Sequence, residues 1–373
     1  MDPVRRYPFL KSMLEPFEVR RQRTLALCIA AIAVTGQARS FAVATTMARW
    51  LGTQLQSAIN RFYRLLRNDH LDEQTMVAQW AKTLCRDKTK PLLIAVDWTE
   101  WHSGLRMLVA AVVTGRRAIP VAARAFAQRI WRGSQNTREN DFLRLLAAAL
   151  KQAHLDAILL CDRGFRRVSW LTMIDRHGLS FVVRLMDDVH VQLDGRSVAL
   201  KDIELRRGRI LDLGEVALRA DAKHAFRVVG YRKKGASQTW WLATNLTDPP
   251  SRILSLYDRR MTIEEQFRDL KGKRFGAKLS WTRFRDPLQL ARFVMLLAIA
   301  LLIWMLTGHH AANKQPTLQL VSKSKGPRQS FVTIGLRLAG LDPPPLRLTD
   351  VSLLQWLPAP DLRAIAGSSR GGK

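Results

Sequence analysis

Two aspartates are placed where carboxylates could serve metal-dependent chemistry. Asp97 and Asp162 each follow a short apolar run, residues 91–96 and 157–161. Such a run is typical of a strand buried on both faces, so each carboxylate is expected where its strand ends. Taken singly, either aspartate also fits an ordinary cap or turn residue.

A third carboxylate, Glu264, lies in the segment from Tyr257 to Lys271. If this segment is one helix, Tyr257, Arg260, Glu264 and Lys271 share a stripe that covers less than roughly a quarter of its circumference. A capping box beginning at Thr262 would restart the helix there and still leave Glu264 and Lys271 on one face. The plain alternative is a surface helix in which Arg260 and Glu264 form an ion pair.

Three carboxylates suit phosphodiester cleavage assisted by two hard cations. Such cations neutralise the attacking and leaving oxygens together, and Mg²⁺ prefers carboxylate oxygens to histidine or cysteine ligands. Asp97, Asp162 and Glu264 are therefore predicted to be the catalytic residues and the ligands of two Mg²⁺ ions, for which Mn²⁺ can substitute. The same site could nick DNA with water and then join the freed 3′-OH to another strand.

The charge of the chain indicates a polyanionic partner. Sixty Lys and Arg residues face 31 Asp and Glu residues, which gives a net charge of +29. A protein this basic attracts nucleic acid, and double-stranded DNA is the predicted partner. A basic surface without a specific partner is the alternative.

The elements around the carboxylates predict an α+β fold with a mixed sheet. Apolar patterns indicate the order βββαβαβ, with crossover helices between the later strands. The strands are expected near residues 91–97, 106–113, 119–126, 157–162 and 179–185, and the helices near 137–154 and 168–176.

Changes of pattern along the chain suggest five regions. They are a helical N-terminal region over 1–85, the first part of a catalytic core over 86–186, a β-rich insertion over 187–246, the second part of the core over 247–310, and a partly flexible C-terminal region over 311–373. The last residues, 358–373, are expected to fray.

A helix predicted over residues 54–66 carries three arginines beside its apolar stripe. Arg61, Arg64 and Arg67 lie three residues apart. In a helix-turn-helix arrangement such a helix could enter a DNA groove, so these arginines are predicted to bind the DNA end. An ordinary solvated helix face explains them equally well.

The signature residues resemble a known family. Tyr257, Arg260, Glu264 and Lys271 match the Y-(2)-R-(3)-E-(6)-K signature of bacterial insertion-sequence transposases of the family-four type, which have an Asp-Asp-Glu active site. The runs IAVDWT and LLCDRGF around the two aspartates are similar to the other two motifs of that group, and the resemblance spans about residues 90–275.

The resemblance implies a ribonuclease-H-like fold, cut-and-paste transposition, and a homodimer that pairs two transposon ends. It also implies that the β-rich insertion helps to hold the transposon end. Arg260 and Lys271 would contact phosphates near the scissile bond, and Tyr257 would stack or hydrogen-bond near the transposon end. Trp240 or Trp241 could stack on a flipped base, although each fits a packed sheet residue better.

Three alternatives remain open at this level. The first is a ribonuclease-H-like nuclease without strand transfer, and the second is a non-catalytic DNA-binding derivative of a transposase. The third is a membrane protein, which depends only on the apolar run over 293–306; its 14 residues are short for a bilayer span, which needs roughly 20. Three widely spaced cysteines and the N-terminal sequence favour a cytoplasmic, nucleoid-associated protein.

Overall fold

The computed structural model describes residues 7–339 except 86, 88, 102–103, 115–116, 128–134, 219–223, 273–276, 280–281 and 315–329. The fold is α+β, as predicted. Its main sheet has eight strands in the order β3-β2-β1-β4-β5-β10-β9-β8, and a second sheet has two strands, β6-β7. The expected fraying of residues 358–373 lies outside the described part.

The central strands follow the predicted order βββαβαβ. The antiparallel strands β1, β2 and β3 form one half, and β4 and β5 run parallel to β1 on its other side. The bounds are β1 (Leu92–Trp101), β2 (Leu105–Thr114), β3 (Arg117–Ala127), α7 (Gln135–Ala153), β4 (Ala157–Cys161), η3 (Arg163–Phe165), α8 (Val168–Arg176) and β5 (Ser180–Leu185).

One strand boundary differs from the prediction. Asp97 does not end its strand, because β1 continues to Trp101. The continuation pairs with β2 as far as Trp101 opposite Leu105, whereas the parallel pairing with β4 ends at Val96 opposite Cys161. The apolar run before Asp97 therefore marks where the pairing of β1 with β4 ends, and not where β1 itself ends.

The segment over residues 187–246 is rich in strands, but three of them extend the main sheet. β10 pairs antiparallel with β5, and β9 and β8 follow it outward. Trp241 on β10 is only 2% exposed and fills the space above Gly230, where an added Cβ would come within 2.4 Å of its ring. The bounds are β6 (His190–Leu193), β7 (Arg196–Ala199), η4 (Leu200–Asp202), β8 (Ile210–Ala217), β9 (Ala225–Tyr231) and β10 (Trp240–Thr244).

The signature segment forms two helices joined by a tight turn. They are α9 (Pro250–Asp258), η5 (Arg259–Met261) and α10 (Thr262–Lys271). The capping box expected at Thr262 is absent, because this hydroxyl donates to the carbonyl of Arg259 and Met261 is the N-cap without a side-chain bond. The backbone stays right-handed through the turn, so the segment remains close to one helix.

The apolar run over 293–306 belongs to a much longer helix, α11 (Pro287–Lys314). The length argument against a membrane span is therefore wrong: Pro287–Ala312 is long and apolar enough to cross a bilayer. However, 94% of its most apolar window is buried inside the molecule, as in the core helix of a soluble protein. Trp304 on α11 donates its indole N–H to the carbonyl of Ala33, which ties this helix to the N-terminal region.

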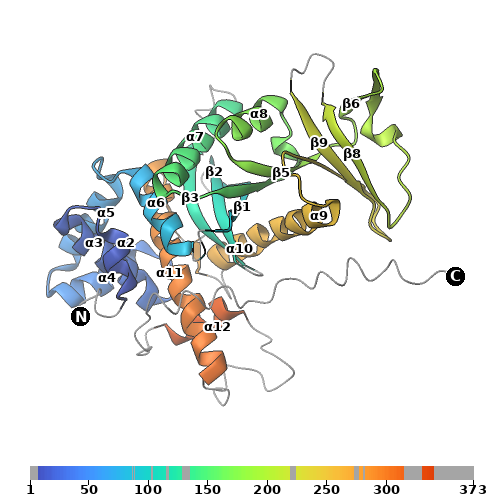
Figure 1. Ribbon diagram of the computed structural model, residues 1–373. Helices are drawn as coiled ribbons and strands as arrows, with labels where there is room; N and C mark the ends of the chain where they lie inside the picture. Colours follow the sequence, from blue (N-terminus) through green and yellow to red (C-terminus); the bar gives the residue numbers. More distant parts are fainter. Residues whose placement is uncertain are drawn as a thin grey trace.

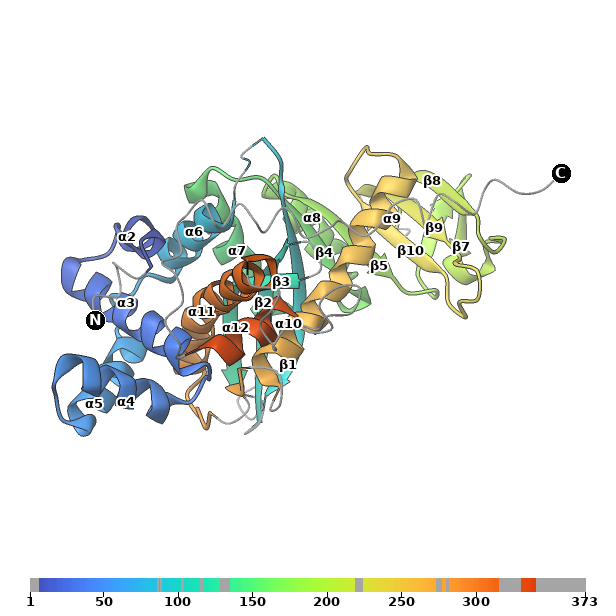
Figure 2. The same cartoon turned by 90° about the horizontal axis from the view of Figure 1, so that it is seen from below.

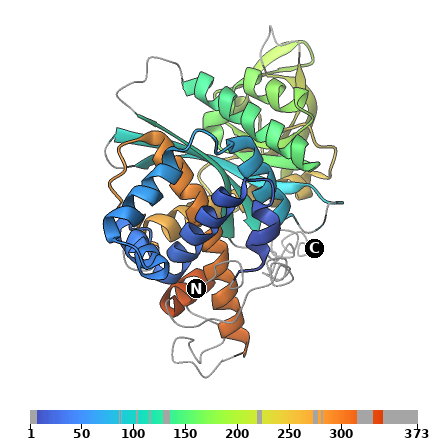
Figure 3. The ribbon, with the colours of Figure 1, turned by 90° about the vertical axis from the view of Figure 1, so that its left-hand side faces the viewer.

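The N-terminal helices gather at one end of the molecule, where two of them contact α11 (Figure 3). They are α2 (Phe9–Leu14), α3 (Val19–Thr35), α4 (Ser40–Leu51), α5 (Leu55–Arg67) and α6 (Glu73–Leu84). A further helix, α12 (Phe331–Leu338), crosses α11 at a pair of glycines, Gly308 and Gly335.

Helices cover both faces of the main sheet. In Figure 1, α7 and α8 lie on one face, and α9 and α10 lie on the other. Seen from below, α10 and α11 both lie over the antiparallel half of the sheet (Figure 2), where α10 contacts β1, β2 and β3 and α11 contacts β3. This arrangement brings the signature helix across β1, the strand that carries the first aspartate.

Candidate active site

The first two carboxylates are neighbours in the sheet. β1 and β4 pair in parallel up to Val96 opposite Cys161, and the next residue on each strand is Asp97 and Asp162. Both carboxylates therefore lie at the same level of adjacent strands. They interact electrostatically, since the charge of Asp162 raises the pKa of Asp97.

A tight turn fixes the second carboxylate. Asp162 is the N-cap of η3, and its Oδ1 accepts a hydrogen bond of 2.8 Å from the backbone N–H of Gly164. A Cβ on Gly164 would lie 2.9 Å from this oxygen. The Asp-Arg-Gly run therefore needs the glycine, because any side chain there would push the carboxylate away.

Arg260 contacts both the first carboxylate, Asp97, and the third, Glu264. Its Nη1 lies 3.3 Å from Asp97 Oδ2, and its Nη2 lies 3.4 Å from Glu264 Oε1. The Arg260 side chain is only 11% exposed, whereas that of Glu264 is 49% exposed. The predicted pair between Arg260 and Glu264 exists, but it also includes Asp97 on the interior strand β1, so it is more than a surface ion pair.

The protonation of Asp97 reflects these neighbours. Burial raises its pKa to about 6, and the negative charge of Asp162 acts in the same direction. Arg260 and the N–H of Trp98 oppose this shift, and Glu264 adds a smaller upward contribution. Three carboxylates thus share one region, and their mutual repulsion is a feature that a bound cation would relieve.

The remaining two signature residues have different surroundings. Tyr257 is 4% exposed and packs edge-on against Trp240, with ring centroids 5.1 Å apart. Burial raises the pKa of its hydroxyl to about 12. Lys271 lies at the level of Thr99 and donates to its hydroxyl and to the carbonyl of Glu100. The predicted DNA contacts of Tyr257 and Lys271 stay predictions, and the buried ring of Tyr257 would have to become accessible to stack.

Glu139, which the sequence did not single out, connects the segments that carry the two aspartates. It lies on α7, is 1% exposed, and accepts a hydrogen bond of 3.0 Å from the indole N–H of Trp98, next to Asp97. Its other oxygen accepts one of 2.8 Å from Arg167, which follows the turn after Asp162. A signal existed: Glu139 falls on the apolar stripe of its helix, where a lone carboxylate is unusual.

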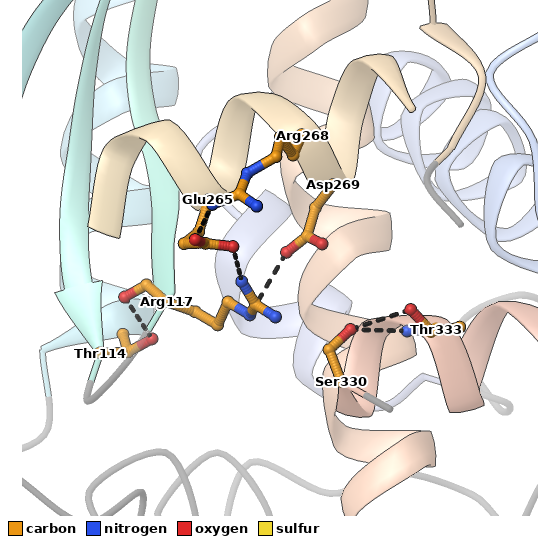
Figure 4. A network of polar contacts seen from close by, with 7 residues as sticks. All are labelled: Thr114, Arg117, Glu265, Arg268, Asp269, Ser330 and Thr333. Atoms are coloured by element: carbon orange, nitrogen blue, oxygen red, sulfur yellow. Dashed lines mark hydrogen bonds and ion pairs between the residues drawn. The ribbon is translucent and has the colours of Figure 1, made fainter. Parts of the chain in front are cut away.

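A second network holds α10 against the sheet (Figure 4). Arg117, at the start of β3, contacts Glu265 at 2.9 Å and Asp269 at 3.5 Å. Arg268 pairs with Glu265 from the solvent side. Since Glu265 is next to Glu264, this network sets the position of the third carboxylate along the sheet.

The three arginines predicted to bind DNA lie apart from the carboxylates. Arg61, Arg64 and Arg67 are all exposed on α5, in the N-terminal helical region. The structure does not bring them to the site of Asp97, Asp162 and Glu264. Their role in DNA binding stays a prediction.

The donor set suits a hard cation in chemistry, although it is not a preformed metal site. Carboxylate oxygens are the ligands that Mg²⁺ prefers, and the pKa of Asp97 is raised first by burial and then by the nearby charge of Asp162. Among the residues that the structure describes, no three His, Cys, Asp or Glu side chains are grouped closely enough to hold a metal ion. Arg260 lies between Asp97 and Glu264 and would have to release them.

Comparison with protein families matches residues 88–303 to the family described as "Transposase DDE domain". A search of curated proteins found no match. Among solved structures, the chain is similar to the piggyBac transposase in its synaptic complex with hairpin DNA, with a TM-score of 0.44 and 11% identity, covering 98% of this chain and 81% of that one. Because the family match covers more than half of the chain and includes all three carboxylates, the chain belongs to the transposase DDE domain family, whose members are DNA transposases.

Proposed function

We propose that this transposase cuts DNA at the ends of an insertion sequence and joins the freed 3′-OH to target DNA, with a ribonuclease-H-like core as the catalytic domain. Members of the family generally use divalent metal ions, and we assign two Mg²⁺ ions to Asp97, Asp162 and Glu264, with Mn²⁺ as a substitute. The observation that carries the proposal is the contact of Arg260 with both Asp97 and Glu264, beside the adjacent Asp162.

When bound, the metal ions would neutralise charge on the attacking and leaving oxygens. The chain itself would hold three carboxylates where the two halves of the sheet meet, and it would supply cations nearby. Arg260, once released from Asp97 and Glu264, could bind a phosphate with both of its Nη atoms. Lys271 adds a point charge, and burial raises the pKa of the Tyr257 hydroxyl to about 12, so this hydroxyl stays neutral to a higher pH than an ordinary tyrosine.

The proposal also covers the group of transposases to which the enzyme belongs, its DNA substrate and its oligomeric state. The Y-(2)-R-(3)-E-(6)-K residues favour an enzyme of the insertion-sequence group that carries this signature, acting on double-stranded DNA as a homodimer in the cytoplasm. The alternative of a nuclease without strand transfer is tested with DNA that already ends in a free 3′-OH. Joining of that end to a target duplex supports the transposase, and hydrolysis alone supports the nuclease.

The test of the site replaces Glu264 by Gln, which keeps the shape and removes the charge that a hard cation needs. Nicking and strand transfer should both be lost, whereas binding to end-bearing DNA in a gel shift should survive. The matched control is Glu215→Gln, an exposed glutamate on β8, which should cut like the parent. Near-parental nicking by the Glu264 variant would refute the mechanism. The only role left for Glu264 would then be the surface ion pair with Arg260, which is worth about 0.3–0.5 kcal/mol.

A further inference from the structure

A hollow lined by arginines lies between the start of α3 and the second half of α5, in the N-terminal helical region. It encloses about 370 Å³, and Arg20, Arg21, Arg61 and Arg64 line it. We call it the arginine hollow. Arg20 and Arg21 lie at least 40 residues before Arg61 and Arg64 in the sequence, so only the packing of the two helices brings the four together.

The charge in the arginine hollow is largely uncompensated. Glu18 also lines it, and its Oε2 lies 3.7 Å from the Nε of Arg21. Both of these side chains are substantially exposed, so this contact stabilises little. Within the described part of the chain, Glu18 is the only carboxylate paired with any of the four arginines. Four guanidinium groups around a concave surface attract an anion, which can accept several of their N–H groups at once.

Local helix preferences do not explain Arg20 and Arg21. Arg20 and Arg21 lie in the first turn of α3, which has no acidic residue. Cations in a first turn oppose the helix dipole and cost some helix stability. By contrast, Arg64 lies in the last turn of α5, where a cation is favourable. A residue choice that conflicts with local preference points to function.

The helices that present the hollow are firmly packed. Leu25 of α3 is fully buried, as are Phe62 and Leu66 of α5. Phe62 packs edge-on against Phe293 of α11, with ring centroids 5.7 Å apart. The arginines thus project from a rigid base, which lowers the entropic cost of holding a ligand between them.

We propose that the arginine hollow binds one phosphate of the DNA backbone and so fixes the position of the N-terminal region on the transposon end. The ligand class, an anionic phosphodiester, follows from the four guanidinium groups; that it belongs to the DNA substrate rests on the proposed function. Contacts of this kind position a protein on a duplex and carry no sequence information directly. The inference adds Arg20 and Arg21 to the predicted Arg61 and Arg64, and it leaves Arg67 outside the hollow.

The test measures binding to end-bearing duplex DNA by fluorescence anisotropy without metal, across a range of salt. The variant Arg20→Ala/Arg61→Ala removes one guanidinium from each wall, and Arg23→Ala/Arg49→Ala is the matched control. The control residues are exposed, belong to α3 and α4, and do not line the hollow. Both variants lose two positive charges, so a general charge effect is equal in the two.

The hollow variant should bind DNA about tenfold more weakly than the control at moderate salt. Its plot of log K against log salt should be less steep by about 0.9, as expected for one lost phosphate contact. Inorganic phosphate at millimolar concentration should compete with DNA more strongly in the parent than in the hollow variant. Equal affinities and slopes for the two variants would overturn the inference while leaving the transposase function intact. If the parent itself fails to bind end-bearing DNA, the proposed function fails instead.

Discussion

Arg260 occupies a position that a cation would compete for, because its guanidinium contacts Asp97 and Glu264 at once. In the absence of metal this contact neutralises part of the repulsion among the three carboxylates. In the mechanism that we propose, the same side chain exchanges its two carboxylate partners for a phosphate. The residue is therefore both a stabiliser of the resting site and a candidate DNA contact.

Glu139 is the residue whose replacement best separates positioning from catalysis. Glu139→Gln keeps the size of the side chain but weakens the charge-assisted hydrogen bond from Arg167, so the turn after Asp162 should loosen. Cleavage of end-bearing DNA should fall by about tenfold to a hundredfold, and more Mg²⁺ should be needed for half-maximal activity, in line with the effect of residues that orient metal ligands.

A purely structural role for Glu139 would lower the melting temperature and leave the Mg²⁺ requirement of the remaining activity unchanged. Thermal unfolding and a Mg²⁺ titration of the nicking rate, run side by side, therefore separate the two roles. Asp141→Asn is the control on the same helix, because Asp141 pairs with Arg144 at the surface. It should behave like the parent in both measurements.

Asp269 gives the molecule a predictable dependence of stability on pH. Burial raises its pKa to about 6, although Arg117 and Arg268 oppose the shift. The folded state therefore binds the proton more tightly than the unfolded state, so the stability from this group is present at low pH and is lost as the pH rises through about 6. Asp269→Asn cannot ionise and should be more stable than the parent at pH 7, by about 3 kcal/mol at most.

Urea unfolding of the parent and of Asp269→Asn at pH 4.5 and pH 7 measures this effect. The difference between the two proteins should grow with pH, and the contribution of Asp97, whose pKa is also raised, cancels in the comparison. If the parent were the more stable protein at pH 7, the ion pair between Asp269 and Arg117 would outweigh the cost of burying the charge.

At the scale of elements, the position of Glu264 depends on how α10 is held on the strands. Arg117 fastens one side of the helix to β3, and Lys271 fastens its end to β1 through Thr99 and the carbonyl of Glu100. Both anchors come from antiparallel strands at one end of the sheet, whereas Asp162 comes from the parallel strand β4. The carboxylates thus converge where the two halves of the sheet meet.

The crossing of α11 and α12 is sensitive to side-chain size. A Cβ on Gly335 would lie 1.9 Å from the carbonyl oxygen of Trp304, so α12 would have to move away from α11. Gly335→Ala should destabilise the protein by about 1–3 kcal/mol, as overpacking does. In an open helical position the same change stabilises by roughly 0.5–1 kcal/mol, so denaturant unfolding that shows a gain in stability would contradict this close crossing.

At the scale of the whole molecule, the net charge of +29 should dominate the interaction with DNA. Each phosphate contacted releases condensed counterions, so log K should fall by about 0.9 per contact for each unit of log salt. Titrations of end-bearing and unrelated duplexes at several salt concentrations measure this slope. A nearly flat response for both duplexes would mean that the basic surface serves another purpose.

The N-terminal helices and the strands of the β-rich segment lie at opposite ends of the molecule. The N-terminal helices lie at one end of the sheet, and β8 and β9 lie at the other (Figure 1). The strand β1, which carries Asp97, and the strand β4, which precedes Asp162, lie between them in the strand order. If the arginine hollow binds a phosphate as proposed, DNA held there would be engaged away from the three carboxylates that we assign to cleavage. This distance is consistent with a transposase that holds and cuts its DNA with different parts of the chain.

The amino-acid sequence alone determined the features that depend on neighbouring residues. The apolar runs before Asp97 and Asp162 predicted two buried strands, and the strand order βββαβαβ followed from the same patterns. These predictions succeeded because periodicity and turn residues report local structure directly. The assignment to the DDE family then followed from the order and spacing of the motifs, and the family comparison confirmed it.

Only the tertiary structure decided the features that depend on contacts between distant segments. The continuation of β1 past Asp97 is set by its pairing with β2, and the length of α11 is compatible with a soluble protein because other elements bury it. The role of Glu139 became visible only when α7 was placed against Trp98, next to Asp97 on β1, and against Arg167, after the turn that follows Asp162. Burial and long-range pairing are properties of the packed molecule, and a single sequence carries no direct record of them.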